Sequence, residues 1–583
     1  MLLESIILIT GLVASYLIIQ SAYDRQPLVK LLTSTFTIFM SLMMLFGYYF
    51  DRFGMPVFSG YTVIAFLLVV GILLLKNGRH LRLDVEVDKK FTLGFILILA
   101  TGFLVHILPA LPSFFPVGRN CDTFQHFAIA KFITEHNSLL IGDKPAYTLF
   151  PGLNNYPFGT HLNIAFISRL FNLDPITIIY PFAVFFSALT AAMLYGMVVE
   201  SKAGDKFYGL FPAFVVLAFY LPMYMLRVMG WWPQVFGIFL VVVFVWLLMD
   251  YVKNPNISGL LPVILVGIAI MFTYTTWMSI IGVTFLLVLM FMTDISKKNK
   301  MIHFFVFSLI FGVFTAYLFT LLEWVKPCLG RGWTYIRFLP FDFFGIRVQE
   351  SHTLIFDTIN NACTLFFAIS IFGAIKSFVD KKNRLLLLFF FASLLLTFIP
   401  LMNVLVFDVR AQVYAKHYYL LSYPAAIFFF TGLKDFISRF NITRSLKDST
   451  AFKAIFIIAL IATVVGAGQV MSIGVRATGH QELAIAPDQY DAALWCKNNL
   501  PASNLTYFAE TPQSFWFYVA SEHPPSSPEL IHGVDISAKF KEWATTAEKG
   551  DIVVVLDISK AKINLDNFAT VYKKGDAVVL QKI

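Results

Sequence analysis

The chain has 583 residues, of which 58% are hydrophobic and only 14% are charged, and its formal net charge is +9. A soluble domain carries about 25% charged residues, so this composition excludes an ordinary soluble protein. In a soluble protein the positive charge would suggest a nucleic-acid partner. Here the basic residues cluster in short loops between apolar runs, as the positive-inside rule predicts for a membrane protein.

Apolar runs of roughly 20 residues, long enough to cross a bilayer as helices, recur along the chain. They include residues 5–19, 57–75, 176–199, 235–249, 302–322 and 452–473. Basic clusters lie near residues 79–90, 297–300, 381–384 and 439–453. If these loops face the cytoplasm, the chain crosses the membrane about 14 times, with its N-terminus and its C-terminal tail outside. We therefore predict a mainly α, polytopic membrane helix bundle in residues 1–474.

The first long outside loop, residues 109–175, carries the most informative polar segment. Residues 122–136 have helical periodicity, with Phe124, Phe127 and other apolar residues on one side, which is typical of a helix lying in the membrane interface. A second short helix is predicted at 161–170. Asp122 and His126 are four residues apart, so they share one face of the first helix.

Asp122 is the best single candidate for chemistry. An Asp–His pair at this spacing can bind a metal ion, or the His can orient a carboxylate that serves as general base. Asp is also a favoured helix N-cap, and the two roles are compatible. His161 follows a turn at 156–161 and either lines a cleft or sits at the interface as a capping or hydrated residue.

A second long outside loop, residues 323–353, is rich in Trp, Tyr and Arg. A guanidinium group suits a phosphate because its planar fork donates two hydrogen bonds at once, although basic and aromatic residues also gather at membrane edges for other reasons. The candidate substrate-binding residues of this loop are Arg331, Arg337, Arg347, Glu350 and His352. Arg410, Lys416 and His417 precede a later span and are candidates for the same phosphate. Arg227 lies between apolar runs and faces either a cleft or the headgroup region.

From Val475 the composition becomes that of a soluble segment. A helix is predicted at 489–499, a strand at 551–557, and a closing hairpin at 571–581 with its turn at Gly575 and Asp576. These elements predict a small α/β domain, residues 475–583, of a size that can hold its own core. It lies on the same outer side as the long loops.

The segments 121–126 (CDTFQH) and 156–161 (YPFGTH), in an outside loop after an early span, resemble the GT-C superfamily of membrane glycosyltransferases. With 93–108 as the first core helix, the Asp122 loop is the first outside loop and 323–353 is the fourth, as in that family. The segment 415–424 looks like the family's late helix, and 491–511 resembles the outside α/β tails of prokaryotic members. The first loop lacks paired acidic residues, and the W-W-D-Y-G signature of oligosaccharyltransferase catalytic subunits is absent. Three spans precede the apparent core, and the sequence assigns them no role.

The resemblance implies a multi-pass plasma-membrane enzyme, a hexosyl- or pentosyltransferase. It would move a single sugar from a polyprenyl-phosphate donor to a lipid, glycan or protein acceptor at the outer membrane face. Asp122 would be the general base, and direct attack would invert the anomeric carbon. Nucleic acid is not an expected partner. No cofactor is certain, and a divalent cation is left open with Asp122, His126, Glu350 and His352 as its ligands.

Other functions stay open. A lipid-linked glycan polymerase or ligase would require a pyrophosphate-linked oligosaccharide. A transporter or flippase would place ionisable residues and broken helices within the membrane, often in paired halves. The apolar runs here are nearly free of acids and no internal repeat is evident, which argues against transport. A non-catalytic assembly subunit would keep the same architecture.

Overall fold

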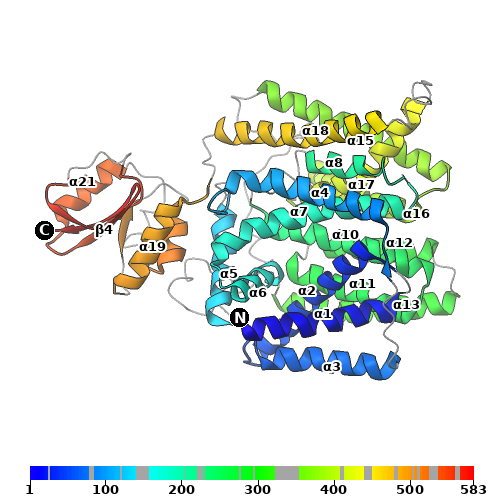
Figure 1. The fold of residues 1–583 in the computed structure, drawn as a ribbon, viewed down its shortest axis with the longest axis horizontal. Coiled ribbons are helices and arrows are strands. Elements are labelled where there is room, and N and C mark those ends of the chain that lie inside the picture. Colours follow the sequence, from blue (N-terminus) through cyan, green and yellow to red (C-terminus); the bar gives the residue numbers. More distant parts are fainter. Residues whose placement is uncertain are drawn as a thin grey trace.

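The computed structural model describes most of the 583 residues (Figure 1). The residues that it leaves out are 24–25, 78–84, 118–120, 140–155, 204, 219–225, 227–229, 275–276, 293–295, 322–352, 408–411, 439–449, 478–482, 502–504, 509–512, 524–535 and 559–564. All structural statements below concern the remaining residues. A large helical bundle and a smaller α/β segment at its end make up the described part of the chain (Figure 1).

The bundle is built from the helices that precede residue 478. The first seven are α1 (Leu2–Ala22), α2 (Leu28–Arg52), α3 (Gly60–Asn77), α4 (Lys89–Ile107), α5 (Cys121–His136), α6 (Gly159–Phe171) and α7 (Pro175–Glu200). They are followed by α8 (Leu210–Ala218), α10 (Trp232–Lys253), α11 (Ile257–Thr273), α12 (Met278–Phe291), α13 (Lys297–Leu321), α15 (Thr353–Val379), α16 (Arg384–Phe407), α17 (Gln412–Ser438) and α18 (Thr450–Ala477). Two short strands, β1 (Gln26–Pro27) and β2 (Val85–Glu86), pair in parallel at the edge of the bundle.

Within the described residues, five helices (α1, α2, α4, α7 and α10) are long and apolar enough to cross a membrane. Seven shorter apolar helical stretches add to them, among them most of α3 and all of α11 and α12. The mainly α membrane bundle expected from the sequence is therefore present. The expected number of about 14 spans is not confirmed, because span length and hydropathy identify only these five.

Helices α7 and α10 form the centre of the bundle. In both, 89% of the most apolar stretch is buried, compared with 44% in α1 and 39% in α4, whose remaining apolar surface faces outward. Asp174 begins α7 by accepting a hydrogen bond from the Ile176 amide, and Pro175 occupies the first turn, where it needs no hydrogen-bond donor. Elsewhere small residues allow close contact between helices: a Cβ on Gly373 of α15 would lie 1.9 Å from the Phe428 carbonyl oxygen of α17.

The two ends of α7 differ in chemistry. Its C-terminal end carries Glu200, which together with Asp250 of α10 binds the buried Lys30 of α2, each carboxylate oxygen being 2.8 Å from the Lys30 Nζ. Beyond this end of α7, Lys206 pairs with Asp88 at the start of α4, so ion pairs gather here. The N-terminal end of α7 lies beside α5 and α6. A 26-residue helix spans about 39 Å, so α7 is long enough to join two membrane surfaces.

The α/β segment, residues 483–583, holds a four-stranded sheet in the order β3-β4-β6-β5. Its strands are β3 (Thr506–Phe508), β4 (Ile552–Val555), β5 (Phe568–Lys574) and β6 (Ala577–Lys582), and its helices are α19 (Pro487–Asn499), α20 (Gln513–Ser521) and α21 (Ile536–Thr546). Strand β3 runs parallel to β4, while β4–β6 and β5–β6 are antiparallel, with Val554 opposite Val579. The helix predicted at 489–499, the strand at 551–557 and the hairpin turning at Gly575 are all present.

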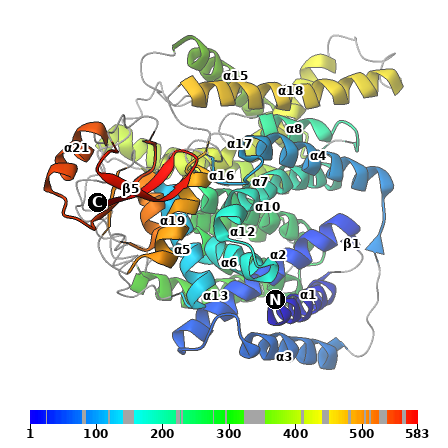
Figure 2. The ribbon, with the colours of Figure 1, turned by 60° about the vertical axis from the view of Figure 1, so that its left-hand side comes forward.

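Alternation along β4 divides the sheet into two apolar faces. Val553 and Val555 belong to a small core with Phe540 of α21, whereas Val554 belongs to the main core of the molecule. The α/β segment therefore has a core of its own and a second apolar face that packs toward α19. Helix α20 packs against α5, and side chains of α19 reach it as well, so the α/β segment lies at the α5 end of the bundle (Figure 1, Figure 2).

Candidate active site

Helix α5 carries the predicted general base. Asp122 is its second residue, although the Asp122 side chain lies outside the described part of the structure. His126 follows one turn later and is 3% exposed. The helix expected from periodicity is confirmed, but its polar face is not open. Residues 126–133 of α5 are all buried, and Lys131 is only 3% exposed, because α6 and α7 cover one side of the helix and the α/β segment covers another.

His126 and His161 meet in the structure. The Nε2 atom of His161 lies 3.2 Å from the Nδ1 atom of His126, so one imidazole donates a hydrogen bond to the other. Tyr156 and Trp232 enclose the pair, with ring centroids 5.3 Å and 6.3 Å from that of His126. The two histidines are 35 residues apart in the chain, and the turn before α6 brings His161 back to α5.

Burial keeps both imidazoles neutral. The loss of hydration lowers the pKa of His161 to about 3, and burial followed by the proximity of His161 lowers the pKa of His126 well below its ordinary value. With pKa values this low, neither imidazole takes up a second proton at neutral pH, although each keeps one N–H group. The two rings can fix the orientation of a group beside them by donating or accepting one hydrogen bond. The pair is therefore suited to orientation rather than to general-base catalysis.

Gly230 is a site residue that the sequence did not single out. Its φ of +61° is in the left-handed region, and a Cβ at this position would lie 1.9 Å from the Thr123 Cγ2 atom. Thr123 is the residue after Asp122. Gly230 thus allows the segment before α10 to pack directly on the first turn of α5, and its only signal in the sequence is a Gly before the two tryptophans at 231–232.

The other predicted substrate-binding residues lie mostly outside the described residues. These are Arg227, Arg331, Arg337, Arg347, Glu350, His352 and Arg410. Lys416 and His417 fall in the first turns of α17, and their side chains are likewise not described. The structure therefore brings His126 and His161 together and does not place the remaining candidates relative to them.

Of the predicted metal ligands, only His126 has a described side chain. Its Nδ1 atom contacts the other histidine, and no group of three or more His, Cys, Asp or Glu residues in the described part of the chain is arranged to hold a metal ion. The expectation of a divalent cation at Asp122, His126, Glu350 and His352 stays a prediction, since three of these side chains are not described.

The end of α2 and the segment between α2 and α3 hold the end of α5. Asn137, just past α5, bonds to the Phe58 backbone in both directions, accepting from its amide at 2.7 Å and donating to its carbonyl at 3.0 Å. Asp51 at the end of α2 accepts hydrogen bonds from Ser138 and from the amide of the next residue, each at 2.8 Å. This part of the N-terminal region, for which the sequence analysis assigned no role, therefore positions the residues that follow α5.

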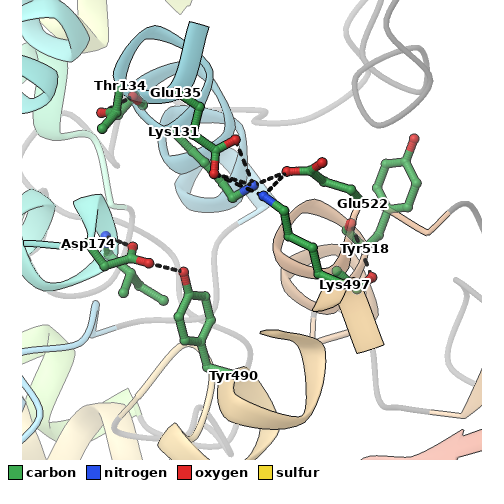
Figure 3. A network of polar contacts seen from close by, with 11 residues as sticks. Lys131, Thr134, Glu135, Asp174, Tyr490, Lys497, Tyr518 and Glu522 are labelled. Carbon is green, nitrogen blue, oxygen red and sulfur yellow. Dashed lines mark hydrogen bonds and ion pairs between the residues drawn. The ribbon is translucent and has the colours of Figure 1, made fainter. Parts of the chain in front are cut away.

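The α/β segment touches α5 and the start of α7 at the same place. The Tyr490 hydroxyl donates to the Asp174 carboxylate at 2.7 Å, and this carboxylate also caps α7 (Figure 3). Burial and then the neighbouring Asp174 charge raise the pKa of Tyr490 well above its ordinary value, so the hydroxyl stays a donor. This contact joins residues 316 positions apart and has no signature in the sequence.

No protein-family model and no curated protein matches the chain. Among solved structures, the archaeal oligosaccharyltransferase AglB from Archaeoglobus fulgidus, in complex with an inhibitory peptide and a dolichol-phosphate, is 12% identical at a TM-score of 0.45 and covers 80% of this chain and 69% of that chain. ArnT from Cupriavidus metallidurans in the apo state is 13% identical at a TM-score of 0.44 and covers 84% and 97%. Another structure of the Archaeoglobus enzyme is a complex with Zn and sulfate, at 13% identity and a TM-score of 0.43, covering 80% and 68%.

Identities of 12–13% and TM-scores below 0.5 describe a distant likeness of fold and say nothing of substrate or activity in this chain.

Proposed function

We propose that the protein is a membrane glycosyltransferase that moves one sugar from a polyprenyl-phosphate donor to an acceptor at the outer membrane face. The observation that carries this proposal is the construction around α5. A carboxylate residue opens a helix that is buried from several sides, and a neutral histidine pair lies one turn further along. A general base has to be held within hydrogen-bond reach of the proton that it removes, and such a helix provides a fixed support.

In the proposed reaction, Asp122 removes the proton from the acceptor hydroxyl while the hydroxyl oxygen attacks the anomeric carbon. The bond between that carbon and the donor phosphate oxygen breaks, and its electron pair leaves with the phosphate. Direct displacement inverts the anomeric configuration. His126 and His161, being neutral, orient the carboxylate or the acceptor without competing for the proton.

The donor phosphate gains charge as it leaves and needs cations. Arg410, Lys416 and His417 are the proposed partners, with Arg residues of the 323–353 loop beside them. Arg227, Glu350 and His352 complete the proposed substrate contacts. The α/β segment would form the extracytoplasmic domain predicted at 475–583, and the cytoplasmic side would be the end of α7 at which the Lys30 cluster lies.

The positions of ionisable residues favour an enzyme over a transporter. In the five membrane-length helices of the described structure, Asp, Glu, Lys, Arg and His residues occur only in the first or last turn, as Glu4 does in α1 and Glu200 in α7. A transporter commonly carries such residues near the middle of the membrane, where they bind substrate or ions. The described spans therefore form a scaffold, and the polar chemistry lies at their ends.

The test is transfer of labelled sugar from a panel of polyprenyl-phosphate sugars by the purified full chain in detergent. Asp122→Asn should lower the rate by about 10²–10⁴-fold, as the loss of a general base does. Asp88→Asn is the matched control, because this carboxylate lies at the opposite end of the bundle and pairs with Lys206. Undiminished transfer by folded Asp122→Asn would refute its role as base, and a product with retained anomeric configuration would refute direct displacement.

A further inference from the structure

Four charged side chains form a ring between α5 and the α/β segment (Figure 3). Lys131 and Glu135 come from α5, Lys497 from α19, and Glu522 directly follows α20. The Lys497 Nζ atom lies 2.6 Å from a Glu522 oxygen and 3.1 Å from a Glu135 oxygen. Lys131 contacts Glu522 and lies 3.2 Å from Glu135. Each lysine thus touches both glutamates, and charge alternates around the ring.

Lys131 needs the partner from the α/β segment. Its side chain is 3% exposed, and a buried ammonium group is unfavourable unless carboxylates surround it. Glu135 alone, one turn away and a third exposed, would leave this charge incompletely compensated. Glu522 supplies the second carboxylate, and it does so from a backbone φ of +59°, which is unfavourable for a residue with a side chain. The fold holds this glutamate in a strained position where it reaches the ring.

Aromatic contacts extend the same interface toward the start of α5. Phe124 stacks on Phe515 of α20 with ring centroids 4.6 Å apart and planes 6° apart. Phe127 stacks on Trp516 at 5.2 Å. Phe124 is two residues after Asp122, and Phe127 is the neighbour of His126. The α/β segment therefore contacts α5 from the turn of the proposed base to the ring at its other end.

We propose that Glu522 and Lys497 are positioning residues for the reaction. Through the ring they fix the rotation and the position of α5 along its axis, and thereby the place of Asp122. This inference rests on the proposed function. An alternating ring can specify one arrangement of two surfaces, since a rotation or a slide of α5 would bring like charges together. Apolar contacts alone would tolerate such a slide more readily.

Charge inversion on each side of the interface tests the ring while the net charge stays constant. The double variant Lys497→Glu with Glu522→Lys places like charges against both α5 residues. The double variant Lys131→Glu with Glu135→Lys creates the same mismatch from the other side. The quadruple variant restores alternation. The matched control inverts the exposed pair Lys574 and Asp491, which lies within the α/β segment and does not touch α5.

Two readouts separate docking from catalysis: hydrogen exchange of the α5 amides, and kcat with donor KM. Both double variants should show faster exchange in α5 and a kcat lowered by about tenfold or more at unchanged donor KM, because the base is misplaced while the donor still binds. The quadruple variant should recover most of both, and the control should match wild type. Thermal unfolding verifies that every variant is folded.

The inference would be overturned if the α5 amides of both folded double variants exchanged hydrogen as slowly as those of wild type. Faster exchange with unchanged kcat would overturn it too, because the ring would then only tether the two parts. A folded quadruple variant that stays as slow as the doubles would show that alternation is not what matters. If wild type transfers no sugar from any donor, the proposed function fails and the catalytic part of this inference with it, while α5 exchange still reports whether the ring docks the helix.

Discussion

Replacing Gly230 by Ala tests whether the first turn of α5 is held in place by close packing. The added Cβ would lie 1.9 Å from the Thr123 Cγ2 atom, whereas real Cβ contacts are essentially never below 3.0 Å. The two groups must therefore separate by about 1.1 Å. The φ of +61° adds strain of about 1–2 kcal/mol for a residue with a side chain, and overpacking adds about 1–3 kcal/mol.

The effect on transfer should exceed the effect on folding. Thr123 follows Asp122 directly, so a displacement of about 1 Å reaches the proposed base, and a misplacement of that size can cost about 10²-fold in rate. We expect Gly230→Ala to lower kcat by about 10–100-fold in protein that still purifies as a folded species. The assay is sugar transfer in detergent, with thermal unfolding measured on the same sample.

A second substitution makes the reasoning refutable. Thr123→Ser removes the Cγ2 methyl group and so opens the space that the new Cβ needs. The double variant Gly230→Ala with Thr123→Ser should recover much of the lost rate. Gly282→Ala in α12 is the control, because a Cβ there meets nothing within 4 Å. A fully active Gly230→Ala, or a double variant no better than the single one, would contradict the packing argument.

Three further predictions concern charge and pH. Lys30→Met leaves the buried Asp250 and the partly buried Glu200 without their main partner and should destabilise the fold by about 3–5 kcal/mol. Lys253→Met, at a side chain 60% exposed, should cost less than about 1 kcal/mol. Equal losses in thermal unfolding would contradict this difference. His161 has a pKa lowered from 6.5 to about 3 by burial. Between pH 6.5 and pH 3 the unfolded state therefore binds more protons than the folded state, and the free energy of unfolding should fall as pH falls through this range. His161→Asn should make this dependence on pH less steep, and acid unfolding curves measure it. Burial raises the pKa of Glu522, but its two lysine partners outweigh this and lower it from 4.5 to about 2. The ionised Glu522 therefore stabilises the fold above pH 4.5, and this contribution is lost as pH falls toward 2. The loss should be about 1–2 kcal/mol, because solvent screens a side chain that is one-third exposed. Glu522→Gln should remove this loss in the same acid unfolding curves.

Much of the architecture could be predicted because it depends on local patterns. Apolar runs identify the membrane helices, and the periodicity of 122–136 and the turn before His161 identify α5 and α6. Alternating apolar residues and the Gly575 turn identify the β5–β6 hairpin. The number of spans was less predictable, because the length of an apolar run does not determine how far its helix extends or whether it crosses the membrane.

Contacts between distant segments had no such local signal. The histidines of the candidate site were found as residue types beside a predicted helix, but their hydrogen bond depends on how α6 packs against α5. Gly230 became recognisable only through its φ and its neighbour Thr123. Lys131 illustrates the limit most clearly: a lysine is rarely buried, and the structure leaves this one only 3% exposed.

By itself the sequence determined the class of protein, the helices and the family that the chain resembles, because hydropathy and periodicity act within a few residues of the chain. Only the tertiary structure decided which charges are buried, which helices meet, and that the α/β segment docks on the helix of Asp122. The physical reason is that burying Lys131 is tolerable only when Glu522, 391 residues away, supplies a counter-charge. That condition is a property of the assembled fold, and no stretch of the chain contains it alone.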